Sequence, residues 1–200
     1  MCDLIEKLID SKVKCRIIEN DQYIKIFSIG SDAQENYIQI KKINTNNFYQ
    51  VEAIHRDNII NIFDTSNINQ ANAVVSILAN KMYKGCIADE KIEVIKKYVN
   101  DKLYDKAEKI ITMKFPQVRF SIGKENESGF SLLKDEEERY LLKYKGKIII
   151  NNMSATRAYV ALYAYCNDLE YIRNWYEHNE GSLTAVIDCE LIEELYLEFC

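Results

Sequence analysis

The sequence predicts an α+β protein built from two similar units, each an antiparallel sheet with a helix packed on one face. Short stretches rich in isoleucine and tyrosine, separated by turn-forming residues, precede an alanine-bearing helical stretch, and this order occurs twice. The tetrapeptide FSIG also occurs twice, at 27–30 and 120–123. We interpret these repetitions as an internal duplication in which Phe27 corresponds to Phe120 and Ala73 to Ala158. The alternative is ordinary α+β organisation with convergent composition.

The first unit is expected to span residues 1–88. Leu4, Ile5 and Leu8 have helical spacing and predict a short amphipathic helix at 2–10. The stretches that follow are rich in β-branched and aromatic residues, which favour strands, and DTSNINQ supplies candidate N-caps for a buried helix. The expected strands are 13–18, 23–29, 37–43, 48–54 and 58–63, and the expected helix is 71–83.

The second unit is expected to span residues 89–200, with the longest helical pattern of the chain, at 88–111, leading it. Ile92, Ile95, Val99 and Leu103 lie roughly on one face of that pattern, with lysines and acids elsewhere. The only proline, Pro116, stands at the start of an expected strand, where its missing N–H costs least. The expected strands are 114–123, 130–134, 139–145 and 147–151, and the expected later helices are 154–176 and 188–200.

Composition indicates a cytoplasmic protein. No apolar run approaches the roughly 20 residues that span a bilayer, and residues 1–15 carry acids where a signal peptide would be basic and then apolar. The six cysteines are scattered and form no CxxC pair, which favours reduced thiols over disulfides. We therefore expect a cytoplasmic location and no membrane association.

The motifs of the common enzyme classes are missing from the sequence. It contains no GxxxxGK[ST], GxGxxG, GxSxG or HExxH pattern, and neither of its two histidines stands near a closely spaced ligand pair. The acidic run at 135–138 is typical of a solvated turn rather than of a catalytic carboxylate pair. We expect no catalytic residues, no metal and no cofactor, although a Cys–His pair assembled in space stays open as an alternative.

Charge is distributed unevenly along the chain. The formal net charge is −5, which makes nucleic acid a poor partner. Residues 164–200 contain nine acids and a single basic residue, Arg173, for a net charge of −8, and the rest of the chain is about +3. Glu190, Glu194 and Glu198 recur at i, i+4 in the last helical pattern, where like charges weaken a helix. An acidic ridge of this kind suggests a cationic partner, and the alternative is that it only maintains solubility.

Tyrosine adds a second indication of a binding surface. Tyr159 and Tyr163 lie one turn apart on the expected helix 154–176, and tyrosine is a favoured interface anchor that suits a surface for arginine and lysine. The predicted partner-binding residues are Tyr159, Tyr163, Asp168, Glu170, Glu177, Glu180, Glu190, Glu194 and Glu198.

In general character the whole chain resembles the immunity proteins that bacteria make against polymorphic toxins. It is small, acidic, rich in isoleucine, lysine and asparagine, and carries an acidic, tyrosine-rich segment. The resemblance implies a non-enzymatic protein that masks the active surface of a cognate, basic toxin by charge complementarity. The alternatives are a phage-encoded inhibitor of a nucleic-acid-binding host defence protein and a small enzyme with an unrecognised site. The sequence does not predict an oligomeric state.

Overall fold

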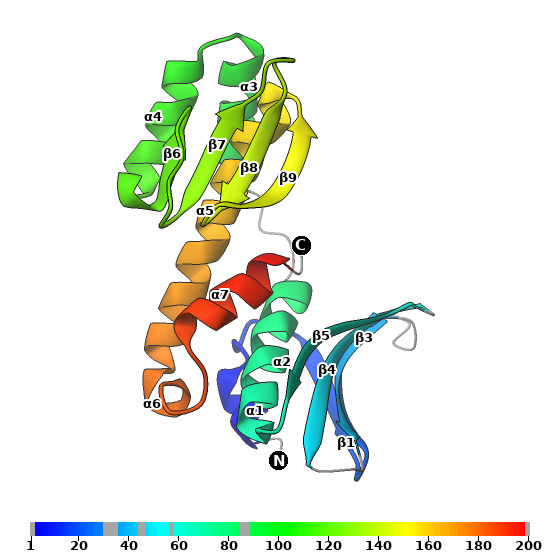
Figure 1. Cartoon of the computed structure of the whole chain (residues 1–200). Coiled ribbons are helices and arrows are strands. Elements are labelled where there is room, and N and C mark those ends of the chain that lie inside the picture. The colour runs from blue at the N-terminus through cyan, green and yellow to red at the C-terminus, as the bar shows by residue number, and fades with distance from the viewer. Residues whose placement is uncertain (1–2, 30–35, 44–46, 57, 85–88, 199–200) are drawn as a thin grey trace. The chain divides into compact units, whose positions relative to one another are not determined.

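The computed structural model describes residues 3–29, 36–43, 47–56, 58–84 and 89–198, and it has the predicted α+β class (Figure 1). The chain forms two compact units: unit 1 comprises Met1–Cys86 and Ile172–Cys200, and unit 2 comprises Ile87–Tyr171. The first division along the chain falls between residues 86 and 87, and the sequence predicted one between residues 88 and 89. The C-terminal segment, however, belongs to unit 1, whereas the sequence placed it in the second unit. One reason is Trp175, whose indole Nε1–H donates to the carbonyl oxygen of Leu8.

Unit 1 contains a five-stranded sheet in which the strands follow their chain order and every neighbouring pair is antiparallel. Alternate residues of the three central strands, among them Ile26, Ile38 and Val51, are fully buried and form the core face. The strands are β1 (Cys15–Glu19), β2 (Tyr23–Ser28), β3 (Asn36–Ile43), β4 (Phe48–His55) and β5 (Asn58–Thr65).

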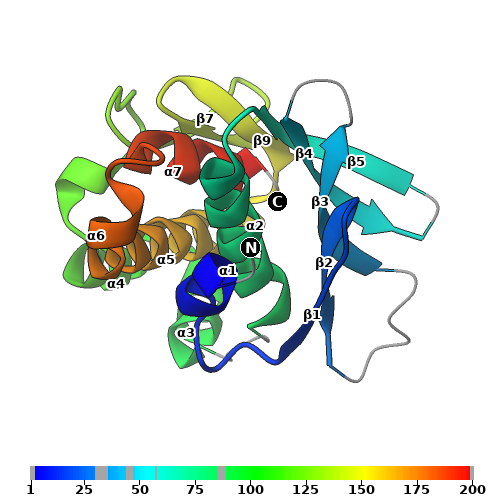
Figure 2. The ribbon, with the colours of Figure 1, turned by 90° about the horizontal axis from the view of Figure 1, so that it is seen from below.

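Helix α2 (Ile68–Tyr83) covers that core face. Asn67 caps it by accepting a hydrogen bond from the backbone N–H of Asn69, and the ten residues 71–80 are all buried. Figure 2 shows α1 and α2 on the same side of the sheet. The remaining helices of unit 1 are α1 (Asp3–Leu8), α6 (Glu180–Leu183), α7 (Cys189–Glu198) and the C-terminal end of α5 (Ala155–His178).

The end of α1 is held by side chains from two distant parts of the chain. Asn80, which is fully buried, accepts from the backbone N–H of Asp10 at 2.8 Å and donates to the carbonyl oxygen of Leu8 at 3.1 Å. Trp175 donates to the same Leu8 oxygen at 2.8 Å. Carbonyl groups at a helix C-terminus lack partners within the helix, so these bonds satisfy one of them inside the core.

Unit 2 contains a four-stranded sheet in the order β6-β7-β8-β9. Its pairs β7–β8 and β8–β9 are antiparallel, but β6 runs parallel to β7, which corrects the prediction of a purely antiparallel sheet. The connection 123–129 must therefore return to the end at which β6 begins. There Gly129 passes close to the backbone of η1, where a Cβ atom would lie 2.3 Å from the carbonyl oxygen of Arg119. The strands are β6 (Phe120–Ile122), β7 (Phe130–Lys134), β8 (Tyr140–Tyr144) and β9 (Lys147–Met153).

The single long helix expected at 88–111 is two helices, α3 (Glu90–Asn100) and α4 (Tyr104–Lys114). The break follows from local chemistry: Asn100 and Asp101 are poor helix formers, and Lys102 takes a left-handed conformation with φ 59°. The strand expected from residue 114 is also shorter, because Pro116 begins a 3₁₀ turn, η1 (Gln117–Arg119), and β6 starts only at Phe120.

The structure does not confirm the internal duplication. Phe27 lies in β2, which is antiparallel to β3, whereas Phe120 lies in β6, which is parallel to β7. The two FSIG segments therefore do not occupy equivalent strands. Each half does end in an antiparallel hairpin followed by a helix, and Ala73 and Ala158 are both buried, so that part of the correspondence stays a prediction.

Candidate functional site

The two tyrosines predicted as surface anchors are buried, which corrects that prediction. Tyr159 packs its ring against Tyr104 and Tyr140 and donates its hydroxyl to Glu108 Oε1 at 2.9 Å. Tyr163 is fully buried and packs edge-on against Phe115. Because both phenol groups have partners inside unit 2, neither is available to a second protein at the surface.

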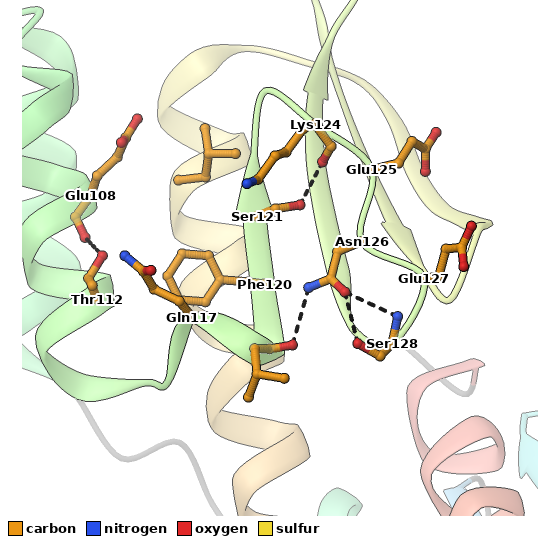
Figure 3. A pocket seen from close by; sticks show the side chains of 12 residues that line it. Glu108, Thr112, Gln117, Phe120, Ser121, Lys124, Glu125, Asn126, Glu127 and Ser128 are labelled. Atoms are coloured by element: carbon orange, nitrogen blue, oxygen red, sulfur yellow. Dashed lines mark hydrogen bonds between the residues drawn. The ribbon is translucent and has the colours of Figure 1, made fainter.

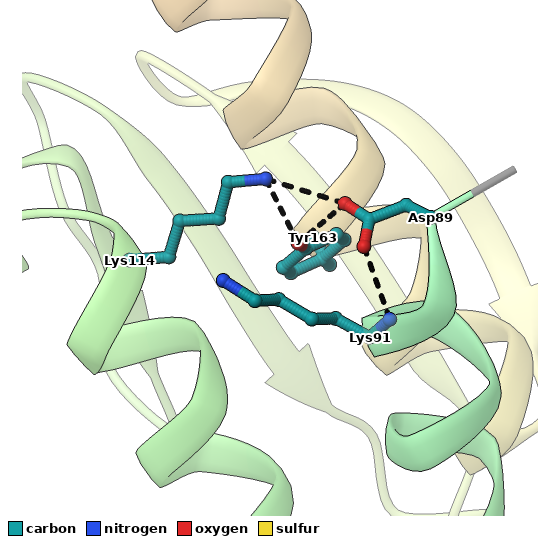
Figure 4. Close-up of polar contacts among 4 residues, drawn as sticks. All are labelled: Asp89, Lys91, Lys114 and Tyr163. Carbon is teal, nitrogen blue, oxygen red and sulfur yellow. Dashed lines mark hydrogen bonds and ion pairs between the residues drawn. The ribbon is translucent and has the colours of Figure 1, made fainter. Parts of the chain in front are cut away.

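Tyr163 belongs to a polar cluster with Asp89 and Lys114 (Figure 4). Its hydroxyl donates to Asp89 Oδ2 at 2.7 Å and accepts from Lys114 Nζ at 2.8 Å, and Lys114 lies 3.3 Å from the same carboxylate oxygen. Asp89 also caps α3 through the backbone N–H of Lys91. The cluster thus ties the start of α3 and the end of α4 to α5.

Electrostatics indicate a structural role for this cluster. The hydrogen bond from Tyr163 holds the pKa of Asp89 below its ordinary value. Burial would lower the pKa of Lys114, but the bonds to Tyr163 and Asp89 outweigh it and raise that pKa. Burial raises the pKa of the Tyr163 phenol. A phenol with a raised pKa stays protonated near neutrality and is a poor general base.

Unit 2 also contains an open cavity of about 700 Å³ bounded by α4, η1, β6 and the loop 123–129 (Figure 3). The hydroxyl groups that line it donate to oxygen atoms of the protein: Ser121 to the Lys124 carbonyl, Thr112 to the Glu108 carbonyl and Ser128 to Asn126 Oδ1. None of these acceptors is the side chain of a base. The lining is therefore a network that shapes the loop, and it offers no activated nucleophile.

The predicted acidic residues fall in different parts of the structure. Asp168 and Glu170 are half-buried on the part of α5 that belongs to unit 2, whereas Glu177, Glu180 and Glu190 are exposed in unit 1. Glu194 is half-buried on α7, and the side chain of Glu198 lies outside the part of the chain that the structure describes.

Helix α7 buries an acidic residue together with its apolar side chains. Ile192, Tyr196 and Leu197 are buried as a hydrophobic stripe, but Glu193 is buried among them and only 4% exposed. Its carboxylate lies 2.5 Å from Nε of Arg173 on α5. Arg173, the one basic residue that the sequence offers near these acids, is therefore engaged by Glu193, which sequence reasoning did not single out.

Exposed acids gather where α5 ends and α7 begins, and we call this group the acidic pole: Glu177, Glu180, Asp188 and Glu190. The free thiol of Cys189 lies beside it. Burial raises the pKa of this thiol to about 11; Glu193, Asp188 and Glu177 also raise it, and Arg173 opposes them. The pKa of Tyr176 is raised as well, by burial first and then by charges that include Asp188 and Glu180. Glu177, Asp188 and Glu180 therefore lie near enough to Cys189 or Tyr176 to add to the effect of burial on these two pKa values.

A second surface is the face of the unit 1 sheet that points away from α2. Cross-strand register places Phe27 beside Tyr37, with ring centroids 5.3 Å apart, and Lys25 Nζ lies over the rings of Tyr23 and Tyr37 at 4.3 and 4.6 Å. These four side chains are half-exposed. Within the described part of unit 1, no helix covers this face (Figure 2). The alternating pattern of the strands predicted such a face but not its aromatic and cationic content.

Two further findings bear on the kind of site. In the ranges that the structure describes, no helix is long and apolar enough to cross a membrane, and no three His, Cys, Asp or Glu side chains are grouped to hold a metal ion. Comparison with known proteins gives no match to a family model, to a curated protein or to a solved structure.

Proposed function

We propose that this chain is a non-enzymatic binding protein that recognises a basic protein through the acidic pole, as an immunity protein does when it neutralises a toxin domain. The observation that supports the proposal most directly is the concentration of four exposed acids at the pole. Segment 172–198 contains one arginine and no lysine, and that arginine is held by the buried Glu193. The positive charge of Arg173 is therefore paired with a carboxylate inside unit 1.

The physical advantage of such a pole lies in association. Exposed charges act over about 8 Å at physiological ionic strength, so they attract a basic surface before contact and orient it. Complementary potentials raise the association rate and select against acidic partners. A toxin that acts on nucleic acid needs a basic active surface, and an acidic pole is suited to covering it.

The test is a charge reversal with a matched control. Glu177→Lys, Glu180→Lys and Glu190→Lys together change the formal net charge from −5 to +1, because each replacement adds two charges. The control, Glu127→Lys, Glu136→Lys and Glu137→Lys, makes the same change at three exposed positions of unit 2. Each protein is immobilised and used to capture proteins from a lysate of its own source cells at several salt concentrations.

We expect the native chain and the control to capture the same basic protein, and the pole variant to lose that capture. The association rate should fall most, and its dependence on salt should weaken. Equal capture by all three proteins would place the interface elsewhere, first of all on the open sheet face. Capture of an acidic protein would contradict the proposal, and capture that duplex DNA displaces would favour the inhibitor of a nucleic-acid-binding protein.

The thiol of Cys189 reports independently whether the variant has changed the local potential. Its pKa is raised from 9.0 to about 11, so its thiolate fraction at pH 8 is about 100-fold below that of an ordinary thiol. We expect alkylation of Cys189, followed by mass spectrometry, to be slow in the native chain, faster in the pole variant and unchanged in the control. Because burial is the largest cause of the raised pKa, only a difference in rate between the pole variant and the control reports the charge of the pole, and equal rates would show that the pole does not act on Cys189.

A further inference from the structure

Strand β5 is the edge of the unit 1 sheet, and its exposed side chains are apolar. It pairs with β4 on one side, and no strand lies beyond it in the described part of the chain. Ile59 is 64% exposed and Ile60 is 53% exposed, although successive strand residues point to opposite faces. Water therefore reaches an isoleucine on each face of the same edge.

The other described sheet edges carry protection that β5 lacks. β1 has five residues and includes Arg16 and Glu19, and β6 has only three residues. β9 begins with Lys147, and Arg139 donates to both the side chain and the carbonyl oxygen of Asn152 on that strand. Charged residues and short length are common defences against strand pairing between molecules. β5, in contrast, is uncharged from Asn58 to Phe63.

The chemistry of this edge fits a second copy of itself. When two copies of one strand pair antiparallel about a two-fold axis normal to the sheet, residues that share a face oppose each other. An axis at Ile60 places Ile60 opposite its own copy and Ile59 opposite Asn61 of the second molecule. No charge opposes a like charge in this register, because the segment has none. The bulge between Asn61 and Phe63 limits the flat edge to its first residues.

We propose that β5 is a homodimer interface, in which two copies of the chain pair β5 with β5 and join their sheets into one. The backbone N–H and C=O groups on the outer side of the strand then find partners. Ile59 and Ile60 lose contact with water on the two faces of the joined sheet. This interface is separate from the acidic pole, so its failure would leave the proposed function untouched.

Sedimentation equilibrium over a wide concentration range tests the proposal. We expect the native chain to reach twice its monomer mass as concentration rises, and the Ile60→Lys variant to remain monomeric, because it sets two like charges directly opposite each other. The control is Ile148→Lys, an equally exposed position (59%) on the β9 edge, which should dimerise as the native chain does. Equal thermal melting of both variants shows that they are folded.

Amide hydrogen exchange identifies the strand involved. We expect those amides of residues 58–62 that point away from β4 to become better protected as the native chain is concentrated, and those of β1 to remain unchanged. A native chain that stays monomeric at the highest concentration would overturn the proposal. So would a dimer that persists in the folded Ile60→Lys variant, or a dimer that leaves the β5 amides unprotected.

Discussion

Asn80 should be among the most sensitive polar residues of unit 1. Replacement by alanine removes the hydrogen bonds to the Asp10 N–H and the Leu8 carbonyl. The Leu8 oxygen keeps the bond from Trp175, but the Asp10 N–H is left without its partner. An orphaned donor costs about 1–3 kcal/mol, and the part-buried Asp10 N–H belongs to the lower part of that range. With about 1 kcal/mol more for the lost bond to Leu8, the free energy of unfolding should fall by about 2–3 kcal/mol.

Urea unfolding followed by fluorescence measures this loss directly. Trp175 is the only tryptophan of the chain and is 7% exposed in unit 1, so its emission reports that unit alone. With a slope of about 1–3 kcal/mol per M urea, the unfolding midpoint should fall by about 1 M. The control is Asn174→Ala, an exposed position on α5, which should shift the free energy by under about 0.5 kcal/mol.

A nearly isosteric variant separates hydrogen bonding from packing. Asn80→Asp can still accept from Asp10 but, when ionised, cannot donate to Leu8, and it buries a negative charge facing a carbonyl oxygen. Burial raises the pKa of such a carboxyl in the folded state, so this variant should lose stability as pH rises above about 4, the unfolded value. If Asn80→Ala unfolds at the same urea concentration as Asn174→Ala, the role assigned to Asn80 is wrong.

Two other predictions concern unit 2. Gly129→Ala should destabilise it by about 3 kcal/mol, because the new Cβ would meet the Arg119 carbonyl oxygen at 2.3 Å and force β6 away from β7. The control, Gly181→Ala in helix α6 of unit 1, has no atom within 4 Å of the new Cβ and should cause no loss of stability in the same circular-dichroism melts. Asp89→Asn should lower the melting temperature of unit 2 at pH 7, and the difference from the native chain should vanish towards about pH 2. Because the folded pKa of Asp89 lies below its ordinary value of 3.8, its contribution is present above that value and lost as pH falls through the folded pKa. The effect should be under about 1 kcal/mol, since the side chains of Asp89 and Lys114 are 29% and 26% exposed, and an equal difference at both pH values would refute it.

Local patterns predicted most of the elements because local chemistry decides them. Each of the five strands of unit 1 overlaps its expected range, since apolar residues that alternate with polar ones form one buried face of a strand. The periodicity of residues 88–111 correctly predicted helical structure. It could not show the break at Lys102, because apolar residues continue at helical spacing on both sides of that residue. The sequence also could not predict that β6 runs parallel to β7, since a strand of three residues can pair in either direction.

The candidate site was less predictable because partners in space are far apart in sequence. Tyr159 and Tyr163 have the composition of interface anchors, but Glu108 and Asp89, which satisfy them, lie 51 and 74 residues away. Glu193 stands in a row of acids and differs from them only because Arg173, 20 residues earlier, enters the same buried layer. Charge counting therefore indicated an acidic C-terminal segment, but it could not sort the acids of that segment into exposed and buried ones.

The discontinuity of unit 1 has a consequence for how the chain folds as it is made. Unit 2 is one uninterrupted segment, so all its residues are present before α7 has been synthesised. Unit 1 lacks Trp175 until late, and the bond from that indole to Leu8 closes a separation of 167 residues. Closing so long a loop is slow when the intervening chain is disordered, and a unit 2 that has already folded removes much of that entropy. During synthesis, unit 1 begins to emerge before unit 2 but is completed after it, and until then the side of α2 that contacts α7 lacks that cover.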